Sequence, residues 1–492
     1  TFPDIKIFKR EELMPALSLI GNMPYSSKKM RDDIRMVRSY YGSRGYADVS
    51  VIPEVRELEG SKVDILYRIT TGTRKRVGLV NIEGNTKSQE RVIRREVPMQ
   101  PGEFYNSVDL ETTKRRLQNL GYFEDVQVTG AASSQDGYRD VNILVQEQRT
   151  GTINFGLGFS SIDRILGRIN LEQSNFDITN WGRFTGAGQR FSVNLQAGST
   201  RTDFRVSLVE PWFLGQKLSL GTDLYYRDLV FLSPEYDQRN IGASVFLRKP
   251  VGRRSYVKGE YRIETVEIEA ESDTTQAFKD EEDEYLRSAL SLNYVYDSRD
   301  SNQLPRRGHK VDLGLIYAGG LLAGDIDTIT FTGSGTKHWS LPFDAILTAR
   351  GSFAVVDSHG DNDHIPIFER QFLGGARDLR GFDFRNIGPR DDIGPNPTQE
   401  VLGGATSVFG SLELTFPVIG QVRGAVFYDA GFVNLDSWDF NTGRLASDIG
   451  VGVRLNLPGI GPLAVDFAVP VETPDEQADD GSQIQFYMDY QF

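Results

Sequence analysis

The residues of this sequence that are best suited to do chemistry lie in one stretch rich in Gly, Arg and Phe, FLGGARDLRGFDFRNIGPRD, at residues 372–391. The stretch belongs to a long interval, 357–404, and long intervals inside compact architectures are usually functional or disordered. Its composition differs from the Ser-, Glu- and Lys-rich mixture of a solvated tail. We therefore expect an ordered loop whose Arg-Gly-Phe tip can fold back into the protein. The tip residues are Arg380, Gly381 and Phe382.

An arginine folded back in this way needs a carboxylate partner, because an unpaired charge in a restricted space is costly. Asp429 in VFYDAGF and Asp466 in LAVDFAV both fall on the polar phase of alternating segments, so both are candidate partners. Phe382 would fill an apolar niche beside the ion pair. The alternative is an ordinary surface loop with a solvated arginine.

Other catalytic or metal-binding patterns are thin. The four histidines, at positions 309, 338, 359 and 364, are scattered, and no Ser, His and Asp set stands in a nucleophile-elbow context. The run DSHGDNDH at 357–364 lacks the Gly and terminal Glu spacing of a calcium loop, and no phosphate-binding Gly-Lys loop occurs. We expect no enzyme activity, no metal and no cofactor; a hydrolase triad assembled across strands is the alternative.

Composition excludes further classes. The net charge of −13 argues against a general nucleic-acid binder, which usually carries a basic face. The longest stretch without a charged residue, from Leu13 to Ser27, is interrupted by prolines and is shorter than the roughly 20 apolar residues of a spanning helix. The sequence contains no Cys, so disulfides and thiol chemistry are absent. Any membrane passage must therefore use strands.

The first 150 residues contain a repeat. The segment that begins at Lys28 matches the segment that begins at Asp109 through a helical stretch, a Gly-Tyr pair and a following strand, with Gly45 equivalent to Gly121. This period exceeds the roughly 20–50 residues of a solenoid repeat. We therefore predict two copies of one small α+β domain, residues 1–74 and 75–150, the first incomplete at its start.

The second copy predicts the order strand, helix, helix, strand, strand. Thr86 and Gln89 form a capping-box pattern for its first helix. Its second helix should run from Leu110 to Gly121, where the glycine suits a left-handed C-terminal cap.

From residue 151 onward, apolar residues alternate with polar or small ones, which is the period of a β-strand. Sixteen such strands are predicted, beginning near Thr152, Gly167, Ala187, Thr202, Lys217, Arg239, Arg254, Glu284, His309, Asp327, Ala345, Ala405, Gln421, Ala446, Pro462 and Ser482.

Two all-β architectures compete for residues 151–492. Strands of a soluble sandwich or propeller usually have about five or six residues, whereas these segments run nine to thirteen. A transmembrane β-barrel needs about nine to eleven residues per tilted strand, with apolar residues toward lipid and polar residues toward the lumen. Aromatic residues toward strand ends, such as Trp212 and Trp339, suit interfacial girdles. We predict a mixed fold: two tandem α+β domains followed by a sixteen-stranded antiparallel transmembrane β-barrel.

The loop motif also carries a family resemblance. LRGFDFRNIGPRD, residues 379–391, resembles the barrel-loop motif of BamA-like outer-membrane insertases, and VGLVNIEGN and LQNLGYFEDVQV resemble their membrane-proximal POTRA domain. The resemblance covers essentially the whole chain. Two-partner secretion transporters and TamA-like proteins share the architecture, but they more often have Tyr after the Arg-Gly pair and lack Ile-Gly-Pro-Arg-Asp. Phe382 and residues 387–391 therefore favour the BamA-like family; Leu379, where Val is commoner, is a mild departure.

The resemblance implies periplasmic POTRA domains before a barrel in the bacterial outer membrane. It implies that Arg380 to Phe382 form an inward-folded tip with Asp429 as partner and Asp466 as the weaker candidate. The expected function is the folding and insertion of other β-barrel proteins. The implied partners are unfolded outer-membrane β-barrel proteins, accessory lipoproteins of an assembly complex and outer-membrane lipid, with no nucleic acid. Five POTRA copies are usual in the best-known members, so two copies predict a piece of a longer protein.

Two other functions stay open: a secretion pore for one polypeptide and, more remotely, a passive porin, which would not need the α+β domains. An insertase would work at the junction of the first and last strands, where no hairpin joins the pair and glycines weaken the first strand. We predict that Asn154 lies opposite Tyr487 and that the carboxyl terminus is periplasmic. The predicted seam residues are Thr152, Ile153, Asn154, Phe155, Gly156, Phe486, Tyr487, Met488, Tyr490 and Phe492.

Overall fold

The computed structural model describes the chain except for residues 1, 3–6, 22, 61, 161–163, 231, 303, 361–363, 392–399, 458–460, 475–480 and 489–492. The chain forms two compact units, one of residues 1–151 with 173–189 and one of residues 152–172 with 190–492. None of the helices in the described ranges is long and apolar enough to cross a membrane.

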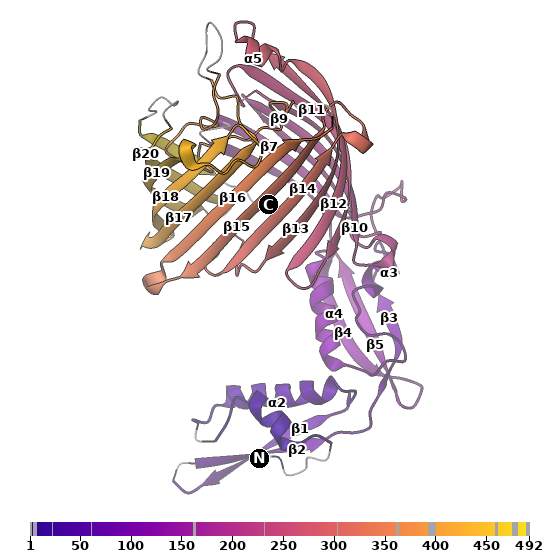
Figure 1. Cartoon of the computed structure of the whole chain (residues 1–492). Helices are drawn as coiled ribbons and strands as arrows, with labels where there is room; N and C mark the ends of the chain where they lie inside the picture. The colour runs from indigo at the N-terminus through magenta and orange to yellow at the C-terminus, as the bar shows by residue number, and fades with distance from the viewer. Residues whose placement is uncertain are drawn as a thin grey trace. The chain divides into compact units, whose positions relative to one another are not determined.

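The first α+β copy packs one long helix on a two-stranded antiparallel sheet (Figure 1). Val37 and Tyr41 on the helix lie against Val51 and Tyr67 on the sheet, and all four side chains are buried. Among the described residues, the sheet of this copy has two strands. The elements of this copy are α1 (Arg10–Leu13), η1 (Met14–Ala16), α2 (Ser27–Gly42), β1 (Ser50–Leu58) and β2 (Lys62–Thr70).

The second copy confirms the predicted order of strand, helix, helix, strand, strand. Its sheet has the order β3-β5-β4, with β3 parallel to β5 and β4 antiparallel to it. Gly121 has a φ of 71°, as a left-handed cap requires, and Gly45 in the first copy has a φ of 99°. The elements are β3 (Arg76–Glu83), α3 (Glu90–Arg94), α4 (Ser107–Asn119), β4 (Phe123–Ala132) and β5 (Tyr138–Glu147).

The predicted capping box of α3 is wrong. The residue before the helix is Gln89, which makes no side-chain capping bond. The hydroxyl of Thr86 instead donates to the carboxylate of Glu147 at 2.9 Å, and that carboxylate also accepts the N–H groups of Lys87 and Ser88. Glu147 on β5 therefore binds the segment that precedes α3.

The rest of the chain forms a closed barrel of sixteen strands, as predicted (Figure 1). Each strand pairs with its neighbours along the chain, and β21 lies beside β6 to close the circle. The barrel strands are β6 (Gly151–Ser160), β7 (Arg164–Phe176), β8 (Gln189–Gly198), β9 (Arg201–Glu210), β10 (Ser219–Leu229), β11 (Tyr236–Pro250), β12 (Ser255–Ala270), β13 (Asp283–Asp297), β14 (Gly308–Ala318), β15 (Thr328–Ser340), β16 (Ile346–Ser358), β17 (Thr406–Ile419), β18 (Val422–Asn434), β19 (Ala446–Leu457), β20 (Gly461–Glu472) and β21 (Gln483–Met488). Short helices lie in the connections: η2 (Phe213–Gly215), α5 (Gln276–Lys279), η3 (Gly320–Leu322), η4 (Pro342–Asp344) and η5 (Thr442–Arg444).

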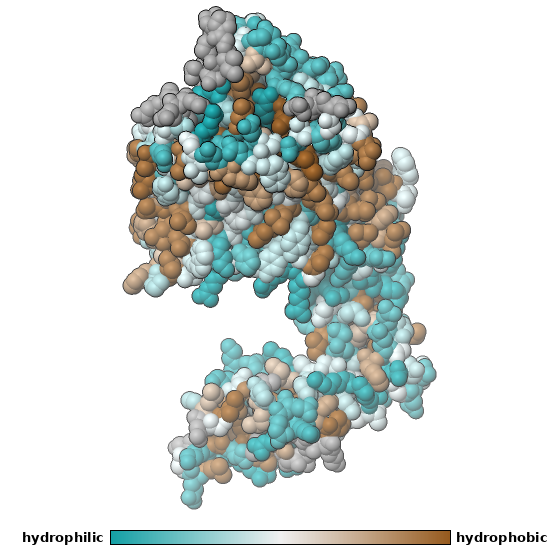
Figure 2. Space-filling model, viewed as in Figure 1, coloured by the Kyte–Doolittle hydropathy of each residue, from teal (hydrophilic) through white to brown (hydrophobic). Residues whose placement is uncertain are grey.

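The apolar phase of the strands faces outward, as the alternation predicts. Leu290, Leu292 and Tyr294 on β13 are exposed, whereas a polar-phase residue such as Arg287 is buried. Figure 2 shows apolar side chains gathered over the barrel wall and polar ones toward its two ends. Four strands exceed the predicted nine to thirteen residues and the roughly nine to eleven that a bilayer needs: β17 has 14 residues, β11 and β13 have 15 each, and β12 has 16.

Candidate functional site

The described part of the long connection between β16 and β17 folds into a loop with a defined tip, as the sequence predicts. Its two legs pair where Gln371 meets Gly404 and, nearer the tip, where Leu373 meets Ile387. Gly375 has a φ of 102°, which suits glycine, and its N–H donates to the carbonyls of Leu379 and Phe382 at 3.1 Å each. These bonds close the chain into a tight tip.

Arg380 at this tip makes the predicted ion pair with Asp429 on β18. Its Nε donates to Oδ2 at 2.7 Å and its Nη2 to Oδ1 at 3.0 Å, so the contact is bidentate. Both residues have a relative exposure of 0%. A bidentate, charge-assisted pair fixes the orientation of the guanidinium as well as its position.

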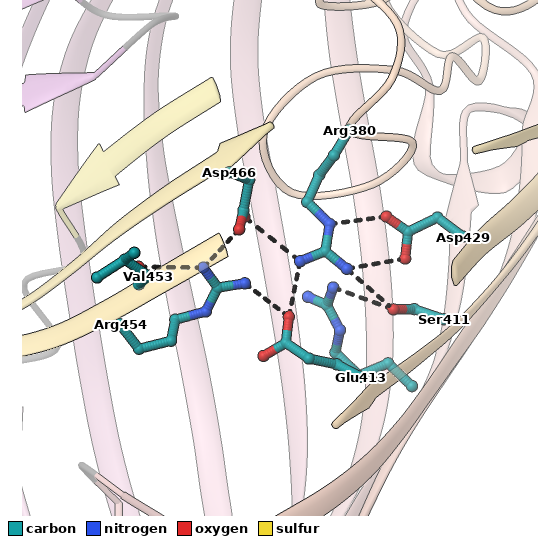
Figure 3. A network of polar contacts seen from close by, with 8 residues as sticks. Arg380, Ser411, Glu413, Asp429, Val453, Arg454 and Asp466 are labelled. Carbon is teal, nitrogen blue, oxygen red and sulfur yellow. Dashed lines mark hydrogen bonds and ion pairs between the residues drawn. The ribbon is translucent and has the colours of Figure 1, made fainter. Parts of the chain in front are cut away.

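The second candidate, Asp466 on β20, also belongs to the site. Figure 3 shows the guanidinium of Arg380 between Asp429 on one side and Asp466 with Glu413 on the other. Nη1 donates to Glu413 Oε2 at 2.7 Å and to Asp466 Oδ2 at 3.4 Å. Arg454 on β19 bridges the same two acids, with bonds of 2.7 Å to Glu413 and 2.5 Å to Asp466. The tip arginine therefore belongs to a network of charged side chains on β17 to β20.

Aromatic and backbone contacts complete the tip network. The guanidinium carbon of Arg380 lies 3.3 Å from the centroid of the Phe427 ring, a cation–π geometry. Phe382 is fully buried, as predicted, in an apolar cluster with Leu373, Leu379, Ile387, Phe409, Val433 and Ala446. Gln485 on β21 donates to the Phe382 carbonyl at 3.4 Å, so the tip also contacts the last strand.

Position 381 has no room for a side chain, so glycine is needed there. A Cβ built on it would lie 2.6 Å from the Cβ of Asp448, closer than real side chains approach. Asp448 on β19 pairs opposite Asp429 and is fully buried, yet neither of its carboxylate oxygens has a hydrogen-bond partner within the part of the chain that the structure describes. The site thus holds more carboxylates than it uses for Arg380.

The same loop is attached to the barrel a second time by residues 364–370, which precede the tip in the chain. We call this segment the root. Arg370 donates to Glu281 at 2.6 Å, and Glu281 also accepts the backbone N–H of Ile367 at 3.0 Å and lies 3.3 Å from His364. Burial alone would raise the pKa of Glu281, but the His364 hydrogen bond and the Arg370 charge outweigh it and hold the pKa below its usual range. Glu281 stays ionised at neutral pH as a result.

Further contacts support the root. Arg287 on β13 binds Glu264 at 3.1 Å and also pairs with Glu369 of the loop. Arg385 donates to the Tyr236 hydroxyl at 2.9 Å and lies over the Phe372 ring at 3.6 Å. An apolar cluster under α5 joins the loop to β11 and β12 through Tyr236, Val266, Ile268, Phe278 and Ile367, with Phe368, Phe372 and Leu402 packed against it.

The predicted seam lies between β6 and β21. Among the described residues these strands pair at one position, where Tyr487 is opposite Ser160. On its other side β21 pairs with β20 continuously, from Leu463 with Met488 to Ala468 with Gln483. The predicted register of Asn154 with Tyr487 is therefore wrong, because the stagger of the closed barrel places Ser160 there.

The other seam residues lie on these two strands. Thr152, Ile153, Asn154 and Phe155 at the start of β6 are all exposed, on both phases of the strand, and Gly156 is partly buried. Phe486 on β21 is exposed, and Met488 is partly buried. Tyr490 and Phe492 lie outside the described residues.

Several site residues are not predicted from the sequence alone: Ser411, Glu413, Phe427 and Arg454 at the tip, and Glu281, Arg287, Glu369 and Arg370 at the root. Two of them could have been predicted to face the lumen, because Glu413 and Arg454 are charged residues on the inward-facing phase of their strands. The root acids lie at or beyond strand ends, where alternation carries no information.

Comparison with known protein families matches both parts of the chain. The Omp85 superfamily domain matches residues 183–492, and the POTRA family, described as a surface antigen variable number repeat, matches residues 5–72 and 75–148. The curated outer membrane protein assembly factor BamA of Nitratidesulfovibrio vulgaris is 26% identical over 481 residues, which is 95% of this chain and 58% of that protein. BamA of Neisseria meningitidis serogroup B is 25% identical over 479 residues, 92% of this chain and again 58% of that protein.

Solved structures agree on the fold. BamA from Haemophilus ducreyi lacking POTRA domains 1–3 superposes with a TM-score of 0.82 at 24% identity, covering 97% of this chain and 96% of that one. CdiB from Acinetobacter baumannii gives a TM-score of 0.54 at 14% identity, covering 99% of this chain and 89% of that one. The chain spans little more than half the length of the curated relatives, but the barrel domain alone matches well over half of the chain. The chain belongs to the Omp85 superfamily.

Proposed function

We propose that this chain is the membrane-embedded part of an insertase that folds β-barrel proteins and inserts them into the bacterial outer membrane. The observation that carries the proposal is the junction of β6 and β21, the first and last barrel strands, which lie side by side without a hairpin to join them. The curated relatives are named as outer membrane protein assembly factors, which supports the same function. In this proposal the barrel lies in the outer membrane and the POTRA repeats lie in the periplasm.

The mechanism follows from the physics of an open strand edge. Lipid cannot satisfy unpaired backbone N–H and C=O groups, so an edge exposed at the junction is costly and offers a template for another strand. A substrate β-barrel protein would add its own strand to β6 by main-chain hydrogen bonds. The process needs no covalent chemistry and no nucleotide.

The loop tip has a defined part in this mechanism. Arg380 is tied to β18 and β20, and Phe382 is tied through its carbonyl to β21. The docked tip therefore connects strands β18, β20 and β21. We infer that it keeps these strands in place while the edge of β6 pairs with a substrate strand. Accessory lipoproteins and outer-membrane lipid are the further partners we propose.

A disulfide across the junction tests the mechanism. The chain has no native Cys, so Ser160→Cys with Tyr487→Cys introduces a single pair at directly opposed positions, whose Cα atoms lie within disulfide range. The matched control keeps Tyr487→Cys and pairs it with Ala464→Cys on β20, which locks two strands that the chain already joins.

We expect oxidation of the 160–487 pair to abolish insertion of substrate barrels, reduction to restore it, and the 464–487 pair to remain active in both states. Full activity with the 160–487 pair oxidised would contradict strand exchange at the junction. Depletion of the protein separates an insertase from a secretion pore, since an insertase is needed for many outer-membrane proteins and a secretion pore for the export of one polypeptide.

A further inference from the structure

Two turns at one end of the barrel expose apolar side chains at their tips. Leu214 in the turn between β9 and β10 is 76% exposed, and Phe343 in the turn between β15 and β16 is 95% exposed. Because neighbouring strands are antiparallel, both turns lie at the end where β6 begins. An exposed single apolar residue is ordinary on a protein surface, so further features must distinguish these two.

The backbone of both residues is the first such feature. Leu214 has φ 56° and ψ 28°, and Phe343 has φ 59° and ψ 31°, which is the left-handed region. A bulky side chain is disfavoured there, whereas Gly or Asn adopts it readily. Neither the backbone nor internal packing therefore explains why these tips carry Leu and Phe.

The second feature is a Trp and Lys pair beside each tip. The Nζ of Lys217 lies 5.6 Å from the Trp212 ring centroid, and the Nζ of Lys337 lies 5.9 Å from the Trp339 ring centroid. Trp is favoured at the headgroup level of a bilayer, and Lys extends its ammonium toward lipid phosphates. Each turn thus combines an apolar tip, an interfacial ring and a cation.

Other turns at this end lack this combination. The turn between β17 and β18 exposes Val418 and Ile419, but its segment contains neither Trp nor Lys. The turn between β11 and β12 carries exposed Arg253 and Arg254, and the turn between β13 and β14 reads SRDSNQLPRR. The two apolar turns flank these polar ones, with strands β10 to β15 lying between them in the barrel order. That wall is the one away from the junction of β6 and β21.

We propose that these two turns are membrane anchors, in which Leu214 and Phe343 enter the apolar layer of the adjacent leaflet and Lys217 and Lys337 bind the phosphates of anionic phospholipid. The inference rests on the proposed placement of the barrel in a membrane.

Spin labels measure the depth of each tip directly, because the full chain has no native Cys. Leu214→Cys and Phe343→Cys are labelled separately and the protein is reconstituted into vesicles of phosphatidylcholine with or without phosphatidylglycerol. Heat-modifiable gel mobility confirms that each variant is folded. We expect dissolved oxygen to collide with both labels more often than a water-soluble nickel chelate does.

Two matched positions calibrate the measurement. Arg253→Cys labels a polar turn at the same end and should report water, whereas Leu290→Cys labels the outward face of β13 and should report lipid. Labels at 214 and 343 that behave like the one at 253, with the label at 290 in lipid, would overturn the anchors and leave the membrane placement intact. A label at 290 that reports water would remove the membrane placement itself.

The lysine contribution has its own test. In the labelled proteins, Lys217→Gln and Lys337→Gln should make the tips shallower in vesicles that contain phosphatidylglycerol and should have little effect in phosphatidylcholine alone. Equal effects in the two kinds of vesicle would overturn the binding of anionic lipid by these lysines.

Discussion

The long loop between β16 and β17 is attached to the barrel at two places, its tip and its root, and the two attachments distribute charge differently. At the tip one guanidinium, Arg380, meets three carboxylates on β17, β18 and β20. At the root, two separate sets of ion pairs, centred on Glu281 and Arg287, hold the loop together with an apolar cluster. The ion pairs of the tip therefore depend on a single side chain, whereas those of the root are divided between two sets.

The largest effect should follow from removing the shared cation of the tip. Arg380→Ala leaves Asp429 buried without its partner, and such a loss costs about 3–5 kcal/mol. Glu413 and Asp466 keep their bonds to Arg454. We expect the tip to leave the lumen, so that protease cleavage within residues 372–391 accelerates about a hundredfold or more, since cleavage follows the open population, and insertion activity falls with it.

Arg385→Ala is the matched control, because Arg385 is a loop arginine of the same stretch that binds aromatic groups instead of carboxylates. Its loss removes a cation–π contact and one hydrogen bond, together about 1–3 kcal/mol. Arg380→Lys should fall between wild type and Arg380→Ala, because an ammonium cannot reproduce the bidentate pair. Equal cleavage rates for Arg380→Ala and Arg385→Ala would remove the distinction between tip and root.

A smaller effect is expected at the root. Glu281→Gln removes the charge that faces Arg370 and weakens the acceptor of the Ile367 N–H, at a cost of about 1–3 kcal/mol. The Arg287 pair and the apolar cluster remain, so cleavage near residues 364–370 should rise about tenfold while the tip stays docked. A second substitution, Glu369→Gln, should add to it. Release of the tip by Glu281→Gln alone would contradict this division of the root.

The tip was more predictable from the sequence than the root, for a physical reason. Asp429 and Asp466 stand on the polar phase of apolar strands, so alternation alone places them in the lumen and leaves Arg380 few other partners. Which residues lie beside Asp429 depends on the register between neighbouring strands. Ser411, for example, lies opposite Asp429 on β17, and the sequence of one strand alone does not determine this pairing. The same dependence explains the wrong register at Asn154. The root joins residues far apart in the chain through loops, where no periodic signal exists.

The two attachments should also respond differently to pH. Burial raises the pKa of Asp378, next to the tip, to about 6. A raised pKa means that the docked tip binds the proton more tightly than the undocked tip, so docking is favoured at low pH and weakens as the pH rises through about 6. The pKa of Glu281 is lowered, so its contribution is complete above the usual value of 4.5 and is lost only as the pH falls further.

Raising the pH from 5 to 7 should therefore weaken the tip by about 1 kcal/mol and leave the Glu281 contribution unchanged. Protease cleavage within residues 372–391, measured at both pH values, gives the first quantity, and cleavage near residues 364–370 gives the second. Asp378→Asn should abolish the pH dependence of the tip. A tip that becomes more accessible on going from pH 7 to pH 5 would show that the sign is wrong.

The smallest effect is expected at Asp448, although it lies at the centre of the tip network. Asp448 is fully buried opposite Asp429 on the neighbouring strand, and neither of its oxygens accepts a hydrogen bond among the residues that the structure describes. Asp448→Asn keeps the shape of the side chain, removes one of two adjacent carboxylates and leaves the bonds between Arg380 and Asp429 in place. The cleavage rate within residues 372–391 should therefore stay within about threefold of wild type, since surplus like charges oppose each other. Asp429→Asn, the same chemical change on the facing residue, removes a bidentate acceptor of Arg380 and should approach the effect of Arg380→Ala. If Asp448→Asn releases the tip as strongly as Asp429→Asn, then Asp448 is a partner of Arg380 and the network is centred between β18 and β19.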